Sequence, residues 1–285
     1  MTRDRPLLVL LAAAAASYPA LVLGWCVAAL LGTVPAAREL WLAGHPGALA
    51  AALLVLMAAV AVGNAARVLV RGLWQTWRFH RWVARRRVPP SGRAHAALAG
   101  WDAVAPVRLV GTRQPLAATA GLWRPYVVIS SGLVAELGGA ELRAVLAHEE
   151  AHARRRDPLR LLLGRALAAH LWFLPLAAEM CGRARRGYEL AADRHAADRC
   201  GRAAVAGALL RLVSAPMSTA STAAFADPGF LRARVSQLES GQPPRAGALP
   251  RGRTALTMSG ALAFVLTVSG AWMVMLLTCP GMAGL

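Results

Sequence analysis

The chain has 285 residues, of which 57% are hydrophobic and 16% are charged, a composition too apolar for an ordinary soluble enzyme. Its formal net charge of +18 comes from arginine alone, because the sequence contains no lysine. The four cysteines form no CxxC pair, which argues against a disulfide framework and against a cysteine-ligated zinc site. We therefore expect a membrane protein.

Three apolar segments are long enough to cross a bilayer as helices, which takes about 20 residues. They cover about residues 7–31, about residues 47–66 and residues 254–278. The first segment could instead be a cleaved signal peptide, since the basic stretch MTRDR precedes it, but its length favours a retained span. We predict two transmembrane helices in residues 1–70 and a third at the C-terminal end.

The juxtamembrane segment that follows, residues 71–95, is basic. Eight arginines and no acidic residue lie between Arg67 and Arg93. Arginine-rich flanks stay in the cytoplasm, so we expect the N-terminus and residues 71–253 inside the cell. The short loop between the first two spans and the C-terminal tail should then lie outside. WQTWRFHRWVARRR could bind nucleic acid, but aromatic and basic residues directly after a span favour the headgroups of the lipid bilayer, and we expect no direct nucleic-acid contact.

Residues 96–213 have the pattern of a mixed α+β domain. The runs VRLVGT and RPYVVIS, rich in β-branched residues, predict two strands, and a helical period follows them. On a helical wheel His148, Glu149 and His152 share the inward side, whereas Glu150 lies opposite and is expected to face solvent.

The motif HEEAH has the spacing of a zinc site. Imidazoles four residues apart on a helix can bind one Zn²⁺ ion, which predicts His148 and His152 as ligands and Glu149 as a general base acting on water. A charged helix with incidental histidines is the alternative. In YELAADRHAADRCG, Glu189 can supply the third ligand, and Asp193 can orient a ligand histidine from behind. The alternative for these two carboxylates is a solvated helix face that pairs with arginines.

Two further segments connect these parts. Residues 161–178 are interrupted by charge and proline, a length suited to a buried or re-entrant helix, and a single crossing would separate Glu189 from His148. We expect His170, within this segment, to be packed or interfacial and not a ligand. Residues 214–253 are predicted to be mainly a flexible linker, with a short amphipathic helix at FLRARVSQL as the alternative.

Three motifs together resemble the M56-type membrane zinc metallopeptidases, the BlaR/MecR-like signal transducers of the β-lactam antibiotic response. GLWRPYVVISSGL resembles the strand and turn before the active helix, LAHEEAHARRRDPL the catalytic helix, and YELAADRHAADRCG the third-ligand helix. The resemblance implies zinc ligands at His148, His152 and Glu189, a general base at Glu149 and a supporting carboxylate at Asp193.

The resemblance also implies a gluzincin-type fold, in which a small sheet lies over the histidine helix. An edge strand near Tyr126–Ser130 would then align the substrate backbone by strand addition. The predicted fold class is an α-helical membrane protein with an inserted α+β metallopeptidase domain, three transmembrane helices and one re-entrant or interfacial helix.

From these features we expect a membrane-embedded zinc endopeptidase that acts on a cytoplasmic or membrane-proximal protein in signal transduction or regulated proteolysis. A transcriptional repressor or the protease itself are candidate substrates. The antibiotic-sensing members continue into a large extracellular penicillin-binding domain, whereas few residues follow the last span here, so we expect a signal to arrive through the spans, the outer loop or a partner. The alternatives are an M48 (HtpX-like) quality-control protease and a non-catalytic zinc-containing receptor or scaffold; RRRDP and the ExxAD spacing favour M56.

Overall fold

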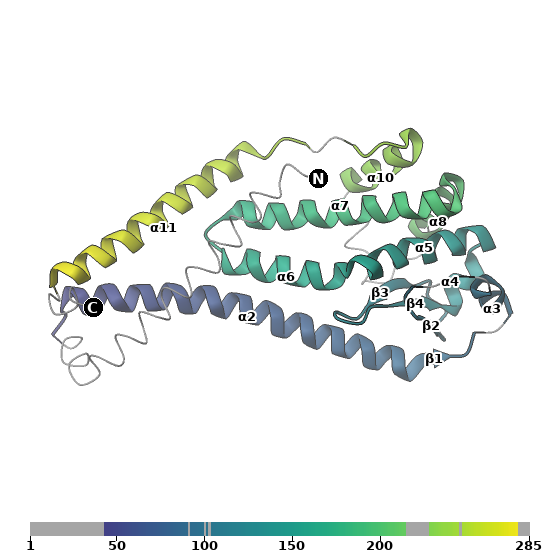
Figure 1. The fold of residues 1–285 in the computed structure, drawn as a ribbon, viewed down its shortest axis with the longest axis horizontal. Coiled ribbons are helices and arrows are strands. Elements are labelled where there is room, and N and C mark those ends of the chain that lie inside the picture. Colours follow the sequence, from purple (N-terminus) through teal and green to yellow (C-terminus); the bar gives the residue numbers. More distant parts are fainter. Residues whose placement is uncertain are drawn as a thin grey trace. The chain divides into compact units, whose positions relative to one another are not determined.

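A computed structural model of the chain describes residues 43–90, 92–99, 101, 104–214, 228–244 and 247–278 (Figure 1). The predicted first span and the C-terminal tail after residue 278 lie outside the described residues. The described chain forms two compact units. One holds the residues up to Val70, Leu163–Cys181 and those from Ala248 onward, and the other holds Arg71–Leu162 and Gly182–Gly247.

The first unit contains the apolar helices. Among the described residues, two helices are long and apolar enough to cross a membrane: α2 (Pro46–Arg86), with a mean hydropathy of 2.2 in its most apolar stretch, and α11 (Arg251–Thr278), with 1.5. Their apolar parts coincide with the predicted second and third spans. Leu54 of α2 and Ala271 of α11 belong to one buried cluster, so these two helices pack against each other.

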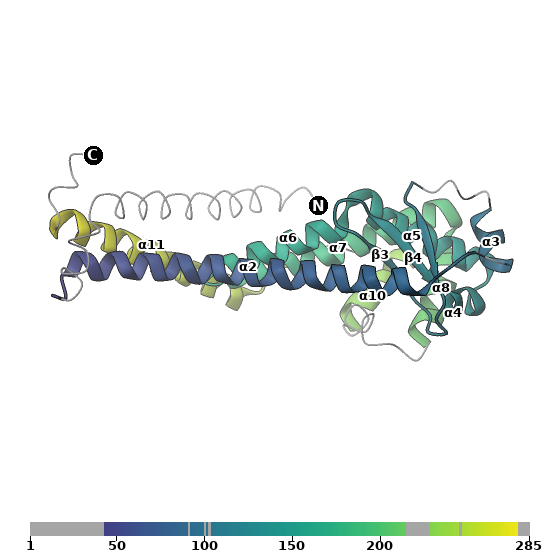
Figure 2. The same cartoon turned by 90° about the horizontal axis from the view of Figure 1, so that it is seen from below.

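Residues 161–178, predicted to suit a buried or re-entrant helix, contain the turn of a helical hairpin. Helix α6 (Asp157–His170) and helix α7 (Pro175–Cys200) run antiparallel on either side of it (Figures 1 and 2). Pro175 begins α7, a position where its missing N–H costs nothing. His170 is buried, as expected for a packed histidine.

The second unit contains a sheet which, in the described part of the chain, has four strands in the order β1-β2-β4-β3. The strands are β1 (Arg87–Val88), β2 (Val107–Val110), β3 (Ala117–Ala120) and β4 (Tyr126–Ser130). β2 pairs with β4 in parallel, and β3 pairs with β4 antiparallel. The prediction of an edge strand at Tyr126–Ser130 is therefore wrong, because β4 has a strand on each side. The edge strands are β1 and β3.

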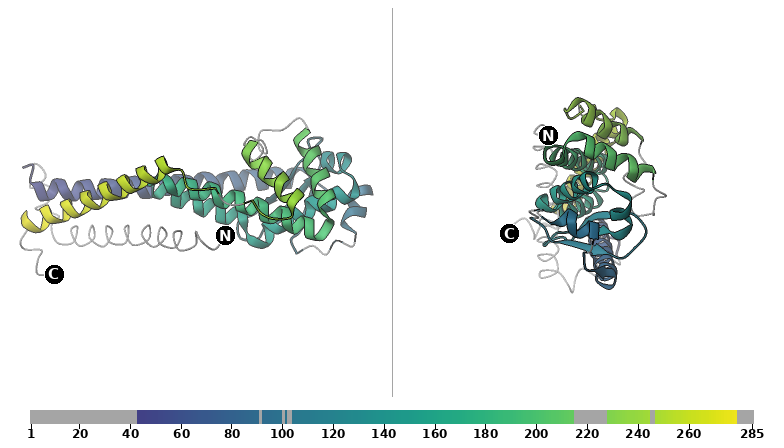
Figure 3. Two further views of the ribbon diagram at one scale, coloured as in Figure 1. Left: turned by 90° about the horizontal axis from the view of Figure 1, so that it is seen from above. Right: turned by 90° about the vertical axis from the view of Figure 1, so that its right-hand side faces the viewer.

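Both faces of this sheet are covered, which explains why every residue of β4 is buried. On one face Val127 and Ile129 pack with residues of α5 (Gly139–Arg155). On the other face Tyr126 and Val128 pack with Val83 of α2 (Figures 1 and 3). The predicted basic segment 71–95 thus continues α2 as far as Arg86 and contributes to the protein core.

Short helices complete the unit: α3 (Gly92–Leu98), α4 (Ser131–Glu136), α8 (Arg202–Ser214) and α10 (Pro228–Ser240). α8 and α10 supply Val205, Leu209 and Leu238 to a buried cluster with the small residues of α5. The flexible-linker prediction is wrong for residues 228–240, because they form helix α10, whose Leu238 is buried in the cluster shared with α8. This helix agrees with the amphipathic-helix alternative at FLRARVSQL.

Candidate metal centre

Helix α5 places two histidines on one face, and its ends are well defined. The helix begins after Gly138, whose backbone N–H donates to the Glu141 carboxylate at 2.8 Å. It ends at Arg156, a residue with φ 53° in the left-handed region, a conformation that costs an L-residue about 1–2 kcal/mol. This reversal lets Asp157 begin α6 directly beside the helix it follows.

The reversal brings a carboxylate onto the second histidine. Asp157 Oδ2 lies 2.7 Å from His152 Nδ1 and also accepts hydrogen bonds from Arg155. His152 Nδ1 can therefore donate to Asp157, which leaves its Nε2 lone pair for a metal. Asp157 was not predicted as part of the site, although it belongs to the RRRDP run that favours the M56 family.

Helix α7 supplies the other carboxylates. Asp193 Oδ1 lies 3.0 Å from His148 Nδ1, and Glu189 Oε2 lies 3.4 Å from His148 Nε2. The alternative of a solvated face is wrong for Asp193, which is fully buried. Both histidines are thus held at Nδ1 by a carboxylate, as expected where carboxylates orient the histidine ligands of a metal.

A third helix completes the site with a residue that the sequence analysis missed. Arg234 of α10 donates two hydrogen bonds to Asp193, at 2.7 Å and 2.6 Å, and Arg234 is itself buried. Its Nη1 lies 3.9 Å from Glu189. No local motif marks this arginine, since it lies 41 residues from its partner and the sequence holds many arginines.

The donor atoms of His148, His152 and Glu189 lie within 4.8 Å of one another, a possible metal site. The two Nε2 atoms are 3.2 Å apart, and Glu189 oxygens lie 3.4 Å and 3.9 Å from them. Ligands about 2.0–2.1 Å from a tetrahedral Zn²⁺ ion are separated by roughly 3.3 Å. The three residues therefore fit this metal and leave a fourth position, as catalytic zinc sites do.

The site is strongly polarised in the absence of metal. Burial opposes the charged imidazolium of His148, but hydrogen bonds with Asp193 and Glu189 outweigh it and raise the pKa to about 9. Burial would raise the pKa of Glu189, but His148, His152 and Arg234 lower it to about 2. The pKa of Asp193 is lowered as well: burial works against this, and His148 and Arg234 overcome it. A cation at the site would replace the proton on His148.

Glu149, the predicted general base, is fixed from the edge strand of the sheet. The Thr119 hydroxyl of β3 lies 2.8 Å from Glu149 Oε2 and 2.7 Å from its backbone oxygen, so it can donate to either. The contact orients the carboxylate. Thr119 is the third residue of the site, after Asp157 and Arg234, that the sequence did not predict.

Glu150 contradicts the helical-wheel prediction that it faces solvent. Its side chain is buried, and it pairs with Arg154 at 2.9 Å and with Arg199 at 2.7 Å. The wheel fails because α5 is covered on two sides, by the sheet and by residues of α7 and α8. Glu150 is a paired structural carboxylate.

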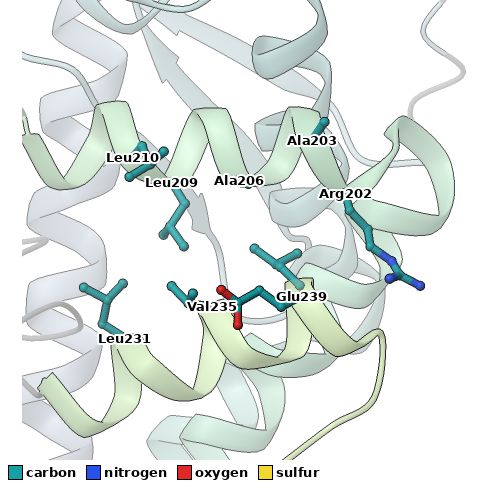
Figure 4. Close-up of a pocket in the computed structure, with 9 residues that line it drawn as sticks. Arg202, Ala203, Ala206, Leu209, Leu210, Leu231, Val235 and Glu239 are labelled. Carbon is teal, nitrogen blue, oxygen red and sulfur yellow. The ribbon is translucent and has the colours of Figure 1, made fainter.

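A cavity of about 390 Å³ lies between α8 and α10, apart from the metal residues (Figure 4). Apolar side chains line most of it, among them Leu209, Leu231 and Val235, with Arg202 and Glu239 at its margin. None of the candidate metal ligands lines this cavity.

Comparisons with known proteins give one family match. A family model described as BlaR1 peptidase M56 matches residues 111–238, a range that contains the three candidate ligands, Glu149 and Arg234. No curated protein matches the chain.

Proposed function

We propose that this protein is a membrane-embedded zinc metalloendopeptidase of the gluzincin type, because a family model described as BlaR1 peptidase M56 matches residues 111–238. The observation that carries the proposal is the convergence of His148, His152 and Glu189 on one point, with a hydrogen-bonded carboxylate behind each histidine. The family consists of metallopeptidases, which agrees with that ligand set.

In the proposed reaction, His148, His152 and Glu189 hold the metal and Glu149 moves the proton. Bound Zn²⁺ supplies Lewis acidity, which polarises the scissile carbonyl and makes water more acidic. Glu149 takes a proton from the attacking water and passes it to the leaving amine nitrogen, so that the peptide bond yields a carboxylate and an amine. Thr119 holds Glu149 in place during both transfers.

We propose that the substrate backbone pairs with β3. Among the described strands, β3 pairs only with β4, so its second edge carries no strand. The same strand supplies Thr119, whose hydroxyl contacts Glu149. A peptide added along this edge would lie next to the general base, and main-chain hydrogen bonds would bind it with little dependence on its sequence.

The two candidate spans favour a substrate that is cytoplasmic or close to the membrane. A transcriptional repressor or a second copy of the protease remain the proposed candidates, with regulated proteolysis or signal transduction as the role. The family match favours this function over a quality-control protease of the M48 type.

The test uses the full chain, purified in detergent, with zinc content and cleavage of a protein mixture from the native cell as readouts. We expect about one zinc per chain and cleavage by the wild type. Glu149→Gln should keep the metal and lose cleavage by roughly 10²–10⁴-fold, because only the general base is removed. Glu189→Ala should lose the metal. Glu136→Gln, at an exposed position on α4, is the matched control.

Stoichiometric zinc that survives in Glu189→Ala would exclude this residue as a ligand. Full cellular function of Glu149→Gln would favour the non-catalytic receptor or scaffold. Thr119→Val should lower the turnover number by about tenfold, and Thr119→Ser, which keeps the hydroxyl, should restore it. Equal activity of the Val and Ser variants would remove Thr119 from the mechanism.

A further inference from the structure

The turn between α6 and α7 carries features that the peptidase function does not use. Residues 166–178, here called the hairpin tip, contain no Asp, Glu or Arg, and charged residues flank them: Arg165 on α6 and Glu179 on α7. The tip belongs to the first unit and packs against α11, one of the two candidate spans. We infer that the hairpin tip enters the bilayer beside α11 and returns on the same side, an inference that rests on the proposed membrane localisation.

The hairpin meets α11 at a polar border. Glu179 Oε2 lies 2.6 Å from Arg253 Nη1, at the start of α11. One turn nearer the tip, the Leu176 backbone N–H donates to the Thr257 hydroxyl at 2.9 Å. The two helices therefore run antiparallel, and charges occur only at the end where the hairpin would leave the membrane.

Beyond this border the contacts are apolar and close. The rings of Phe173 and Phe264 stack with centroids 4.3 Å apart and planes inclined by 5°. A Cβ at position 260 would overlap the carbonyl oxygen of Phe173, so this approach requires Gly260. Small residues that let backbones approach closely are typical of helix contacts inside membranes.

The position of these contacts along α11 gives the depth. Phe264 is 11 positions after Arg253, which corresponds to about 16 Å of helix. Ala271, which packs with Leu54 of the other candidate span, is 18 positions after Arg253, or about 27 Å. Since the hydrocarbon core is about 30 Å thick, the tip reaches roughly its middle.

Part of the backbone of the turn is hydrogen-bonded within the protein. Leu171 N–H donates to Leu167 O at 3.0 Å, Leu174 N–H to Leu171 O at 2.8 Å and Ala177 N–H to Leu174 O at 2.9 Å. Thr257 satisfies Leu176, and Pro175 has no N–H to satisfy. Non-helical backbone at membrane depth needs such internal partners, because lipid supplies none. Trp172 in the turn is 52% exposed, so its apolar ring would contact the acyl chains of the lipid.

The experiment measures the depth of the tip in full-length protein reconstituted in phosphatidylcholine/phosphatidylglycerol vesicles. The native cysteines are replaced by serine, and a nitroxide is attached at Trp172→Cys. Val265→Cys, exposed on α11 next to Phe264, is the control in lipid, and Glu136→Cys on α4 is the control in water. The frequencies at which each nitroxide collides with oxygen and with a water-soluble nickel chelate report the depth of that nitroxide in the bilayer.

We expect the label at position 172 to match the one at 265, with oxygen accessible and nickel excluded. If the ratio of oxygen collisions to nickel collisions at position 172 equals the ratio at position 136, the inference is overturned. Gly260→Leu should displace the tip and raise nickel access at position 172, whereas Gly270→Leu, where an added Cβ meets nothing within 4 Å, should leave it unchanged. Equal effects of the two variants would also overturn it. Zinc content and cleavage are measured separately, so failure of the hairpin inference and failure of the proposed function are distinguishable.

Discussion

The two histidines of the candidate centre are each supported by a carboxylate, but the supports come from different distances along the chain. His152 contacts Asp157, five residues onward, across a single helix end. His148 contacts Asp193 of another helix, and Arg234 of a third helix holds Asp193 in turn. The first support needs only a local reversal of the chain, whereas the second exists only when α5, α7 and α10 are packed together.

Substitutions at the two supporting carboxylates should therefore have different effects on metal binding and on stability. Loss of the local support should change one ligand and little else. Loss of the remote support should affect the metal and the fold together, because Asp193 and Arg234 are both buried.

Asp193→Asn should have the largest effect. It leaves Arg234 buried without its full counter-charge, which should lower the free energy of unfolding by about 3–5 kcal/mol. Loss of the partner of His148 should weaken zinc binding by roughly 10–100-fold. Chemical unfolding and chelator competition measure the two effects. The double variant Asp193→Leu/Arg234→Met should recover much of the stability but not the zinc affinity; recovery of both would contradict a role for Asp193 at the metal.

Asp157→Asn should weaken zinc binding by about tenfold and cost little stability, because Arg155 remains partly solvated at 27% side-chain exposure. The same chelator competition and unfolding measurements apply. Asp198→Asn, at an exposed position on α7, is the control and should change neither. If Asp157→Asn destabilises the protein as much as Asp193→Asn, the distinction between local and remote support is wrong.

The pH dependence of the metal-free protein should report His148. Its folded pKa of about 9 is above the unfolded value of 6.5, so its stabilising contribution is complete below pH 6.5 and is lost as pH rises through about 9. Glu189 acts in the opposite sense, since its contribution is present above pH 4.5 and is lost as pH falls toward about 2.

The unfolding temperature of the metal-free protein should therefore fall between pH 6.5 and 9. His148→Ala should remove this dependence of the unfolding temperature on pH. Apparent zinc affinity should rise over the same interval, because the metal displaces the proton. A zinc affinity independent of pH across this window would show that His148 is not the protonated ligand.

Arg155→Gln should have the smallest effect. Arg155 donates to Asp157 and to the backbone oxygen of Tyr188, but it is partly exposed and Asp157 keeps its contact with His152. We expect a loss of about 1 kcal/mol or less in the free energy of unfolding and a change of zinc affinity within about threefold. Arg160→Gln, at an exposed position on α6, provides the baseline.

The local sequence pattern predicted correctly those features that depend on a single helix or strand. The helix that carries HEEAH, the strands β2 and β4, and the apolar stretches of α2 and α11 lie where the sequence predicts them. Helical and strand periods arise from neighbouring residues, so they can be read without the fold. The same reasoning predicted that Glu189 and Asp193 lie beside the histidines, because carboxylates at this spacing can bind a metal or orient a histidine ligand.

Local pattern failed where the answer depends on what packs from elsewhere. Glu150 was predicted to face solvent because a wheel assumes one covered side, whereas α5 has two. β4 was predicted at an edge because strand order is not encoded in the strand itself. Residues 228–240 were favoured as linker because the stretches around them, STASTAA, QPPRAG and LPRGR, have a linker-like composition. The buried ion pair between α10 and α7 depends on a distant helix and leaves no local pattern.

The sequence by itself determined the chemistry: which side chains can bind a metal, which one can act as a base, and which segments are apolar enough to enter a membrane. Only the tertiary structure decided the surroundings: Thr119 against Glu149, Arg234 against Asp193, and β3 as the edge strand. The reason is physical. Spacing along one helix sets the direction of its side chains, but contacts between helices and strands far apart in the chain depend on burial and on charge pairing that no single segment contains.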